Sequence, residues 1–211
     1  ALNSNFQGSE YEKLRIRLIN KYDKYGNDND DVDYIGSDIL RYYEKSIERY
    51  KNPRGGRFMP GAYTVSAHIP LGAVVGATPD GRKSGEQLAD GGLSPMVGRD
   101  KLGPTAVLKS VSKLDNYLSS NGSLLNMKFN PKVLQGETGV NKMVDLLLAF
   151  VRLKIQHIQF NVVSAETLRD AQKHPEMYKG LVVRVAGYSA FFVELNREIQ
   201  DDIINRTENV M

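Results

Sequence analysis

The chain contains no cysteine among its 211 residues. This absence excludes disulfide bridges, thiolate metal sites, protein-bound iron–sulfur clusters and a cysteine nucleophile within these residues. There is also no run approaching roughly 18 apolar residues, so we expect no membrane-spanning helix. The first residues, Ala-Leu-Asn-Ser-Asn-Phe, lack the charged head and apolar stretch of a signal peptide. We therefore expect a soluble, cytoplasmic protein with no membrane partner.

Neither sign of charge dominates the sequence. Lys and Arg number 28 against 25 Asp and Glu, which gives a formal net charge of +3. The basic residues alternate with acidic ones and form no stripe of the kind that binds a phosphate backbone, so we expect no nucleic-acid partner. The length suits one domain with a sizeable core and is short for two large ones.

Residues suited to hold a metal ion are also scarce. Among the three histidines, no two share a metal-ligand spacing with a carboxylate, so we expect no metal site. The acidic segment NDNDDVD, residues 27–33, lacks the glycine and the distal glutamate that the spacing of an EF-hand requires. We interpret it as an acidic turn before a helix over residues 32–50.

Hydrophobic periodicity and turn residues predict the other elements of the first half. A helix is expected over residues 9–25, with Gly26 where it would stop. From residue 53 to residue 104 glycines are too dense for helices and indicate a strand with long ordered loops. In that region AYTVSAHIPLG, residues 62–72, has the β-branched and aromatic residues of a strand, and TPDGR, residues 78–82, is typical of a tight turn.

The second half alternates between helical and strand patterns. This alternation predicts an α/β fold with parallel strands. The expected elements are a helix at 105–120, a turn at Asn121-Gly122, a strand at 124–130, a helix at 139–154, a strand at 155–163, a helix at 165–178 that Pro175 interrupts, a strand at 181–187, and a helix at 190–207 with Ser189 as its N-cap and Phe192, Leu195, Ile199 and Ile203 on one face.

The most informative motif is RVAGYSAFF, residues 184–192. Gly187 alone would indicate only a turn residue with positive φ. The whole string, followed by an amphipathic helix, resembles the glycyl radical loop of the glycyl radical enzymes, a family that includes pyruvate formate-lyase, the cobalamin-independent glycerol and diol dehydratases, choline lyase and the arylacetate decarboxylases. Further segments similar to the family follow in the family's order: residues 53–63, 76–95, 103–115 and 157–163.

The resemblance implies a fold and a domain organisation. Family members are ten-stranded α/β barrels that enclose two finger loops, one with a cysteine and one with a glycine. This chain would be the C-terminal part of such a barrel. Residues 1–52 would be a helical segment leading into the barrel, and residues 53–211 would be the glycine radical domain, with later barrel strands, helices and the glycine loop. Missing strands would leave an exposed apolar edge.

The resemblance also implies that Gly187 carries the radical. An α-carbon radical is planar, and glycine has no Cβ to crowd the centre. In the supporting loop, Val185 and Ala186, with Phe191 and Phe192, would exclude water and oxygen. Arg184 and Tyr188 would fix the loop by hydrogen bonds, and Ser189 completes it. Ordinary core packing explains the apolar residues equally well.

In this family an activating enzyme that uses S-adenosylmethionine and an iron–sulfur cluster removes one hydrogen from the glycine. We expect the chain itself to bind no cofactor. The stored radical generates a thiyl radical on a cysteine, which abstracts hydrogen from a small-molecule substrate. In dehydratases the substrate radical then loses water with help from a glutamate. The implied partners are the activating enzyme, the cysteine-containing N-terminal part and, for the full-length enzyme, a second copy in a homodimer.

The resemblance leaves the reaction and the origin of the chain open. The motif RVAGYSAFF and the ending EIQDDIINRTENVM favour a glycerol or diol dehydratase (a lyase) over a formate C-acetyltransferase of the pyruvate formate-lyase type. The beginning ALNSNFQG is similar to an internal segment of the family, which favours a fragment of a longer enzyme that is inactive alone. A small repair protein that replaces a damaged glycyl radical region, or a folded fragment with no role by itself, are the alternatives.

Several polar residues outside the glycine loop are candidates for a substrate pocket. Tyr63, His68 and His157 lie on predicted strands that would face the barrel interior, although a satisfied structural histidine is the alternative for both histidines. For Asp80, Arg82 and Asp90, which lie in turn-rich loops, we expect ion pairs or caps.

Overall fold

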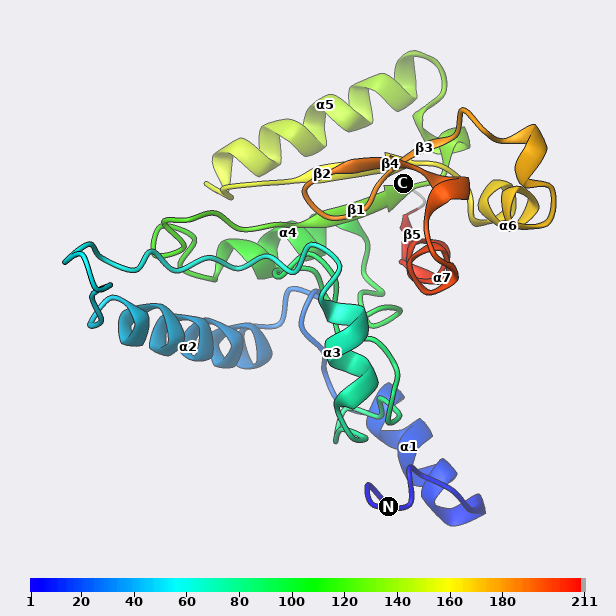
Figure 1. The fold of residues 1–211 in the computed structure, drawn as a ribbon. Coiled ribbons are helices and arrows are strands. Elements are labelled where there is room, and N and C mark those ends of the chain that lie inside the picture. Colours follow the sequence, from blue (N-terminus) through cyan, green and yellow to red (C-terminus); the bar gives the residue numbers. More distant parts are fainter. Residues whose placement is uncertain (210–211) are drawn as a thin grey trace.

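The structure, a computed structural model, describes residues 1–209. Its centre is a parallel sheet in the order β2-β1-β5, built from β1 (Asn126–Phe129), β2 (Gln159–Val162) and β5 (Glu208–Asn209). Parallel neighbours need a long crossover, and helix α5 (Gly136–Arg152) provides it between β1 and β2. Figure 1 shows α5 running alongside these two strands. The predicted α/β fold with parallel strands is confirmed.

The first hydrophobic core lies between this sheet, α5 and helix α4 (Pro104–Ser112). Leu108 and Val111, three residues apart on one face of α4, are fully buried. Phe129 of β1 meets Phe160 of β2 edge to face, with ring centroids 5.6 Å apart. The predicted helix over 105–120 therefore forms, but it ends at Ser112.

The second core joins the elements of the last quarter of the chain. Leu168, Val183, Phe192 and Ile203 are buried there together. Pro175 ends the preceding helix as predicted. The elements are helix α6 (Ala165–Lys173), the antiparallel strands β3 (Val182–Arg184) and β4 (Ser189–Phe191), helix α7 (Arg197–Asn205) and the short 3-10 turns η2 (Pro175–Met177) and η3 (Phe192–Glu194), with a further 3-10 turn, η1 (Pro131–Leu134), after β1.

Two helices precede the core, α1 (Ser9–Asn20) and α2 (Asp30–Ile47). Figure 1 shows α1 projecting away from the sheet. The acidic turn and the start of α2 surround an ammonium group: Lys113 Nζ lies 2.9, 2.6 and 2.9 Å from carboxylate oxygens of Asp28, Asp30 and Asp33. The interpretation as an acidic turn before a helix is confirmed. Within residues 1–209, no group of three or more acidic or histidine side chains is placed to hold a metal ion.

The predicted strand over residues 62–72 is wrong. Turns there lead into helix α3 (His68–Val74), and Val65 has a φ of +55°, which a strand does not allow. Pro70 falls in the first turn of α3, where backbone N–H groups have no intrahelical partner. Gly72 packs against a neighbouring loop so closely that a Cβ would lie 2.5 Å from the Glu86 carbonyl oxygen. Helix α3 is too short to show a helical period in the sequence. The β-branched and aromatic residues around it therefore suggested a strand.

The predicted tight turn at residues 78–82 is confirmed, because Gly81 N donates to Thr78 O at 3.0 Å. Asp80 accepts hydrogen bonds from the Thr78 hydroxyl and the Arg82 backbone N–H. Arg82 is buried and donates to four carbonyl oxygens of the same loop region, those of Val75, Gly76, Lys83 and Glu86. Asp80 and Arg82 therefore organise the loop as caps, as expected.

The predicted helix over residues 190–207 is partly wrong. Residues 189–191 continue the hairpin as β4, and only Arg197–Asn205 are helical. The N-cap is Asn196, whose side-chain oxygen accepts from Ile199 N at 3.0 Å, and not Ser189. Pairing with β3 satisfies the backbone of residues 189–191.

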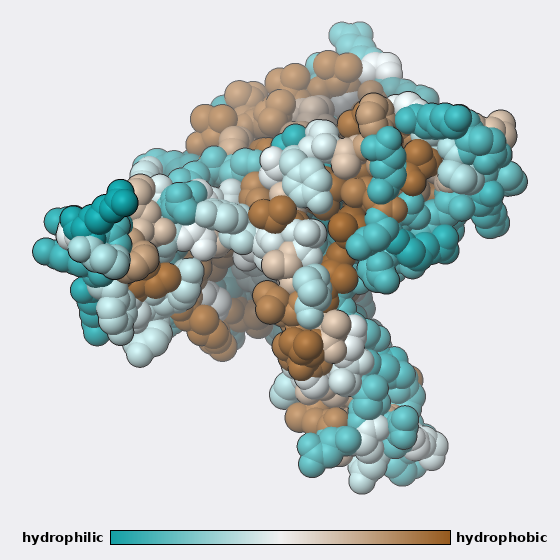
Figure 2. Space-filling model, in the orientation of Figure 1, coloured by the Kyte–Doolittle hydropathy of each residue, from teal (hydrophilic) through white to brown (hydrophobic). Residues whose placement is uncertain are grey.

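Apolar side chains remain exposed on α5 and at the edge of the sheet. Val140, Val144, Leu147, Leu148 and Val151 of α5 are exposed, and Figure 2 shows brown side chains along the edge where α5 lies. β2 is an edge strand, and its Val162 is half exposed. The expected exposed apolar edge is therefore present. No helix within the described chain is long and apolar enough to cross a bilayer.

Candidate functional site

Gly187 lies at the tip of the β3–β4 hairpin. Arg184 pairs with Ser189, and Val185 N donates to Tyr188 O at 2.9 Å, which leaves Ala186 and Gly187 as the two-residue turn. Gly187 has a φ of +83°, in the region that favours glycine. Of the residues that the structure describes, Leu124 alone would come within 4 Å of a Cβ at this position, at 3.4 Å, so the backbone conformation and not crowding selects glycine here.

The hairpin tip borders an open hollow of about 440 Å³. Gly187 is exposed, whereas its neighbours Val185 and Ala186 are fully buried. The glycine is therefore accessible on a turn whose base is anchored in the second core. The other lining residues are Tyr63, Val65, Asn121, Gly122, Ser123, Leu124, Ala186 and Tyr188.

Two carboxamides of β2 attach the hairpin to the central sheet. Gln159 and Asn161 are two positions apart, so both point to the same face of the strand. Asn161 makes two hydrogen bonds with the main chain of Arg184, accepting from N at 2.8 Å and donating to O at 2.7 Å. Gln159 Oε1 accepts from Gly187 N at 3.2 Å. The glycine is therefore held through the side chains of β2.

The side chain of Arg184 reinforces this attachment. Its guanidinium donates to Gln159 Oε1 at 3.1 Å and to the Ser189 hydroxyl at 3.0 Å. Contacts of this kind are what the expected role of Arg184 in fixing the loop requires, and that role stays a prediction. Tyr188 takes part through its carbonyl oxygen, which accepts from Val185 N.

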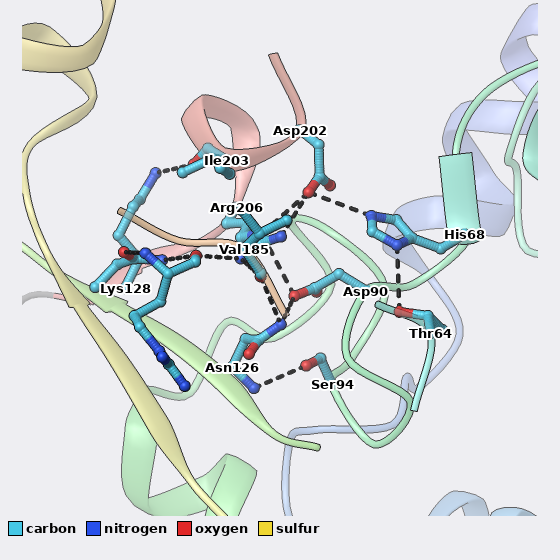
Figure 3. A network of polar contacts seen from close by, with 12 residues as sticks. Thr64, His68, Asp90, Ser94, Asn126, Lys128, Val185, Asp202, Ile203 and Arg206 are labelled. Carbon is cyan, nitrogen blue, oxygen red and sulfur yellow. Dashed lines mark hydrogen bonds and ion pairs between the residues drawn. The ribbon is translucent and has the colours of Figure 1, made fainter. Parts of the chain in front are cut away.

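Arg206, which follows α7, holds the hairpin from the other side (Figure 3). Its guanidinium donates to the Val185 carbonyl oxygen at 2.7 Å and to Asp202 Oδ2 at 2.7 and 3.2 Å. Asp90 Oδ2 lies 3.4 Å from Arg206 Nε. All three charged side chains are buried, so the ion pairs are shielded from water. The expected ion pair of Asp90 is thus present.

The network extends to the loop that precedes α3 (Figure 3). His68 Nε2 lies 3.2 Å from Asp202 Oδ2, and its Nδ1 lies 3.2 Å from the Thr64 hydroxyl. Asn126 of β1 donates to both Asp90 Oδ2 and the Val185 carbonyl oxygen. Segments far apart in the sequence therefore converge on the backbone just before Gly187.

Burial and neighbouring charges act differently on the two carboxylates that Arg206 contacts. Burial alone would raise the pKa of Asp202, but the contacts with His68 and the charge of Arg206 bring that pKa below its ordinary value. Burial raises the pKa of Asp90 in spite of Arg206. Asp202 is therefore the firmly ionised partner of Arg206.

Lys128 of β1 fixes the end of α7 from which Arg206 extends. Its ammonium is buried and donates to the carbonyl oxygens of Ile203 and Ile204, at 3.3 and 2.7 Å. A cation is favourable at the C-terminus of a helix. Desolvation nevertheless lowers the pKa of Lys128 to about 8.

Of the three predicted pocket residues, the structure brings only Tyr63 to the hollow beside Gly187, where its hydroxyl accepts from Asn121 Nδ2 at 2.5 Å. His68 is buried in the Asp202 network and lines no part of this hollow. His157 precedes β2, and its Nδ1 accepts from Leu125 N at 3.4 Å. Burial and the charge of Arg184 lower the pKa of His157.

The apolar residues around the hairpin differ in burial. Val185, Ala186 and Phe192 are fully buried, in line with a water-excluding role, but Phe191 is exposed. Gln159, Asn161, Asn126, Asp202 and Arg206 were not among the predicted site residues. A signal was present for the first two, because carboxamides at alternate positions of a buried strand need hydrogen-bond partners.

Comparison with known proteins agrees with the motif and the fold. The family model for the glycine radical matches residues 89–193, and the model described as pyruvate formate lyase-like matches residues 1–72. The chain belongs to the glycyl radical enzyme family. The C-terminal glycine radical portion that the sequence indicated is thereby confirmed.

Three similar proteins are dehydratases by name. The chain is 49% identical to the probable dehydratase YbiW of Escherichia coli (strain K12), covering 100% of the chain and 27% of that protein. It is 42% identical to the trans-4-hydroxy-L-proline dehydratase of Clostridioides difficile, covering 99% and 26%. The glycerol-bound B12-independent glycerol dehydratase from Clostridium butyricum superposes with a TM-score of 0.94 at 48% identity, covering 100% and 26%. The chain spans about a quarter of the length of these relatives.

Proposed function

We propose that this chain stores a radical on Gly187 for a glycyl radical dehydratase of the glycerol or diol type. The observation that carries the proposal is the likeness over the whole chain to a glycerol dehydratase, with 48% identity and a TM-score of 0.94. The accessible, glycine-selective turn at Gly187 supports it, because that residue is both reachable and free of a side chain.

The residues of this chain would hold and orient the glycine. Gln159, Asn161 and Arg206 bind the main chain on either side of the turn, and Val185 and Ala186 anchor it in the core. Tyr63 borders the same hollow and is a candidate substrate contact. The 211 residues contain no cysteine, so the thiyl residue of the proposed cycle must come from outside them.

The proposal also covers how Gly187 is activated and which reaction follows. An activating enzyme that uses S-adenosylmethionine and an iron–sulfur cluster removes one hydrogen atom from Gly187. The glycyl radical then takes a hydrogen atom from the cysteine thiol of the cysteine-containing part, and the thiyl radical takes one from the substrate. The substrate radical loses water, and the product radical takes the hydrogen atom back from the thiol to give an aldehyde, which regenerates the thiyl radical. A homodimeric full-length enzyme and a cytoplasmic location belong to the same proposal and rest on the family resemblance.

The test is anaerobic activation of the protein that carries this chain, together with the cysteine-containing part. A glycyl doublet in the electron paramagnetic resonance spectrum and aldehyde formation from glycerol or 1,2-propanediol support the proposal. Gly187→Ala is expected to show neither. Turnover of pyruvate and coenzyme A without dehydration would favour the formate acetyltransferase alternative. No radical on the wild-type chain would refute radical storage.

Activity restored when the chain is added to an enzyme cleaved at its own glycine would instead support a repair function. A radical on the chain that gives no turnover until the cysteine-containing part is supplied supports the fragment hypothesis. These two results separate the alternatives that the sequence leaves open.

A further inference from the structure

One side chain contacts the backbone nitrogen of the glycine itself. Gln159 Oε1 accepts from Gly187 N at 3.2 Å, and Gln159 is 6% exposed at the start of β2. Within the described part of the hairpin, the hydrogen bonds of Asn161 and Arg206 go to residues 184 and 185 and not to Gly187. Gln159 is therefore placed to act on the amide next to the reactive carbon.

The orientation of the Gln159 carboxamide follows from its donors. Arg184 Nη2 also donates to Oε1, at 3.1 Å, so two N–H groups converge on this oxygen. The reverse orientation would set the Nε2 hydrogens against both donors. The oxygen therefore faces Gly187.

The other end of the carboxamide is buried without a partner. Gln159 Nε2 makes no hydrogen bond within the described chain. Leaving a buried amide unpaired costs about 1–3 kcal/mol, so an apolar side chain would suit mere packing better. The carboxamide at position 159 is therefore explained by the hydrogen bonds that its oxygen accepts from Gly187 and Arg184.

The chemistry of an α-carbon radical gives that oxygen a role. The unpaired electron is shared with the amide nitrogen, and sharing requires the amide plane to stay aligned with the carbon orbital. A hydrogen bond from this N–H polarises the amide and leaves more electron density on nitrogen. An acceptor fixed at Gly187 N thus both orients the amide and favours the radical.

We propose that Gln159 is a positioning residue that stabilises the radical through the Gly187 amide, an inference that rests on the proposed function. Forming the radical breaks one Cα–H bond homolytically. The hydrogen atom leaves with the organic radical that the activating enzyme supplies, and one electron remains on the glycine carbon. Gln159 gains and loses neither proton nor electron.

The test compares Gln159→Met with Gln159→Glu in the protein that carries this chain, activated anaerobically. Methionine keeps the length and removes the acceptor, whereas glutamate keeps an oxygen beside Arg184. Gln156→Met is the matched control, because Gln156 precedes the same strand but contacts Ser119 and Ser123 instead. The measurements are radical yield and the hyperfine coupling of the exchangeable amide proton.

For Gln159→Met we expect a radical yield about tenfold lower, the factor that 1.4 kcal/mol represents. The amide-proton coupling should change as well. Gln159→Glu should restore both, and Gln156→Met should match the wild type. A merely structural role would not alter the coupling. Gln159→Met with wild-type yield and coupling overturns the inference.

A second measurement separates this inference from the proposed function. Absence of any wild-type radical refutes radical storage, whereas hydrogen exchange at the Gly187 amide tests the contact without activation. Protection that is lost in Gln159→Met supports positioning, and equal exchange rates overturn it. If Gln159→Met does not fold, Gln159→Asn replaces it, because the shorter side chain withdraws the oxygen and should have the same effects.

Discussion

The guanidinium of Arg206 donates a 2.7 Å hydrogen bond to the carbonyl oxygen of Val185, two residues before Gly187. The contact joins the end of α7 to the hairpin, and Asp202 and Asp90 surround the same guanidinium. The glycine loop is therefore held by a buried charge cluster as well as by the strand pairing of β3 and β4.

Replacing Arg206 should destabilise the fold strongly. Arg206→Met leaves the buried carboxylates of Asp202 and Asp90 without their cation, and loss of one partner from a buried pair costs about 3–5 kcal/mol. Urea unfolding would measure the loss. Arg197→Met is the control, because the exposed pair between Arg197 and Asp201 contributes less than about 1 kcal/mol. Equal effects of the two variants would contradict a clamp at Arg206.

Lys113 should contribute more to the free energy of unfolding than its neighbour Lys109. Lys113→Met removes the ammonium that three carboxylates share, including the fully buried Asp33, and should lower the free energy of unfolding by about 2 kcal/mol. Among residues 1–209, the ammonium of Lys109 pairs with Asp28 alone, in an exposed pair, so Lys109→Met should cost less than about 1 kcal/mol. Chemical denaturation of both variants measures the difference, and a reversed order would be inconsistent with the ion-pair geometry.

Because of the backbone conformation at Gly187, any side chain there should destabilise the fold, independently of radical chemistry. At a φ of +83°, Gly187→Ala should lower the free energy of unfolding by about 1–2 kcal/mol. Gly180, near the start of the same hairpin, has open space around it and no positive φ. Gly180→Ala should therefore be neutral or stabilise by up to about 1 kcal/mol. Comparable destabilisation by both would show that the positive φ is not what selects glycine.

His157 gives the protein a dependence on pH with a defined sign. Its folded-state pKa lies below the ordinary value of 6.5, so the unfolded chain binds more protons just below that pH. Stability is therefore complete above about pH 6.5 and is lost as pH falls toward the lowered folded-state value. Unfolding free energies at several pH values, in the wild type and in His157→Gln, would show a smaller loss in the variant. An NMR titration of the His157 ring with a raised midpoint would contradict this prediction.

The sequence predicted the elements whose signal is local. The helix that became α5 and the turn at residues 78–82 have strong periodicity or turn chemistry of their own, and both were found. The stretch from residue 62 to residue 72 has strand-like composition, but packing of Gly72 against the loop at residues 86–88 makes its end helical. That contact is not visible in any local pattern.

The candidate site was predicted only in part, because contacts between distant segments build it as well. Gly187 and Arg184 lie within one motif, so their association followed from the sequence. Gln159 and Arg206 lie 28 and 19 residues away, as their numbers show, and reach the glycine loop only through the parallel register of β1 with β2 and the path of α7. Tertiary contacts decide which polar residues meet at the hairpin.

The exposure of Gly187 predicts a specific oxygen sensitivity. A carbon-centred radical at an exposed turn is open to dioxygen, so air should cleave the activated chain at this glycine and release the segment that follows it. Mass spectrometry after anaerobic activation and brief exposure to air would detect the shortened chain. Gly187→Ala, treated identically, should remain intact, as should wild type that was never activated. An unaltered mass in spite of a measured radical would remove the assignment of the radical to Gly187, because the electron would then reside on another residue.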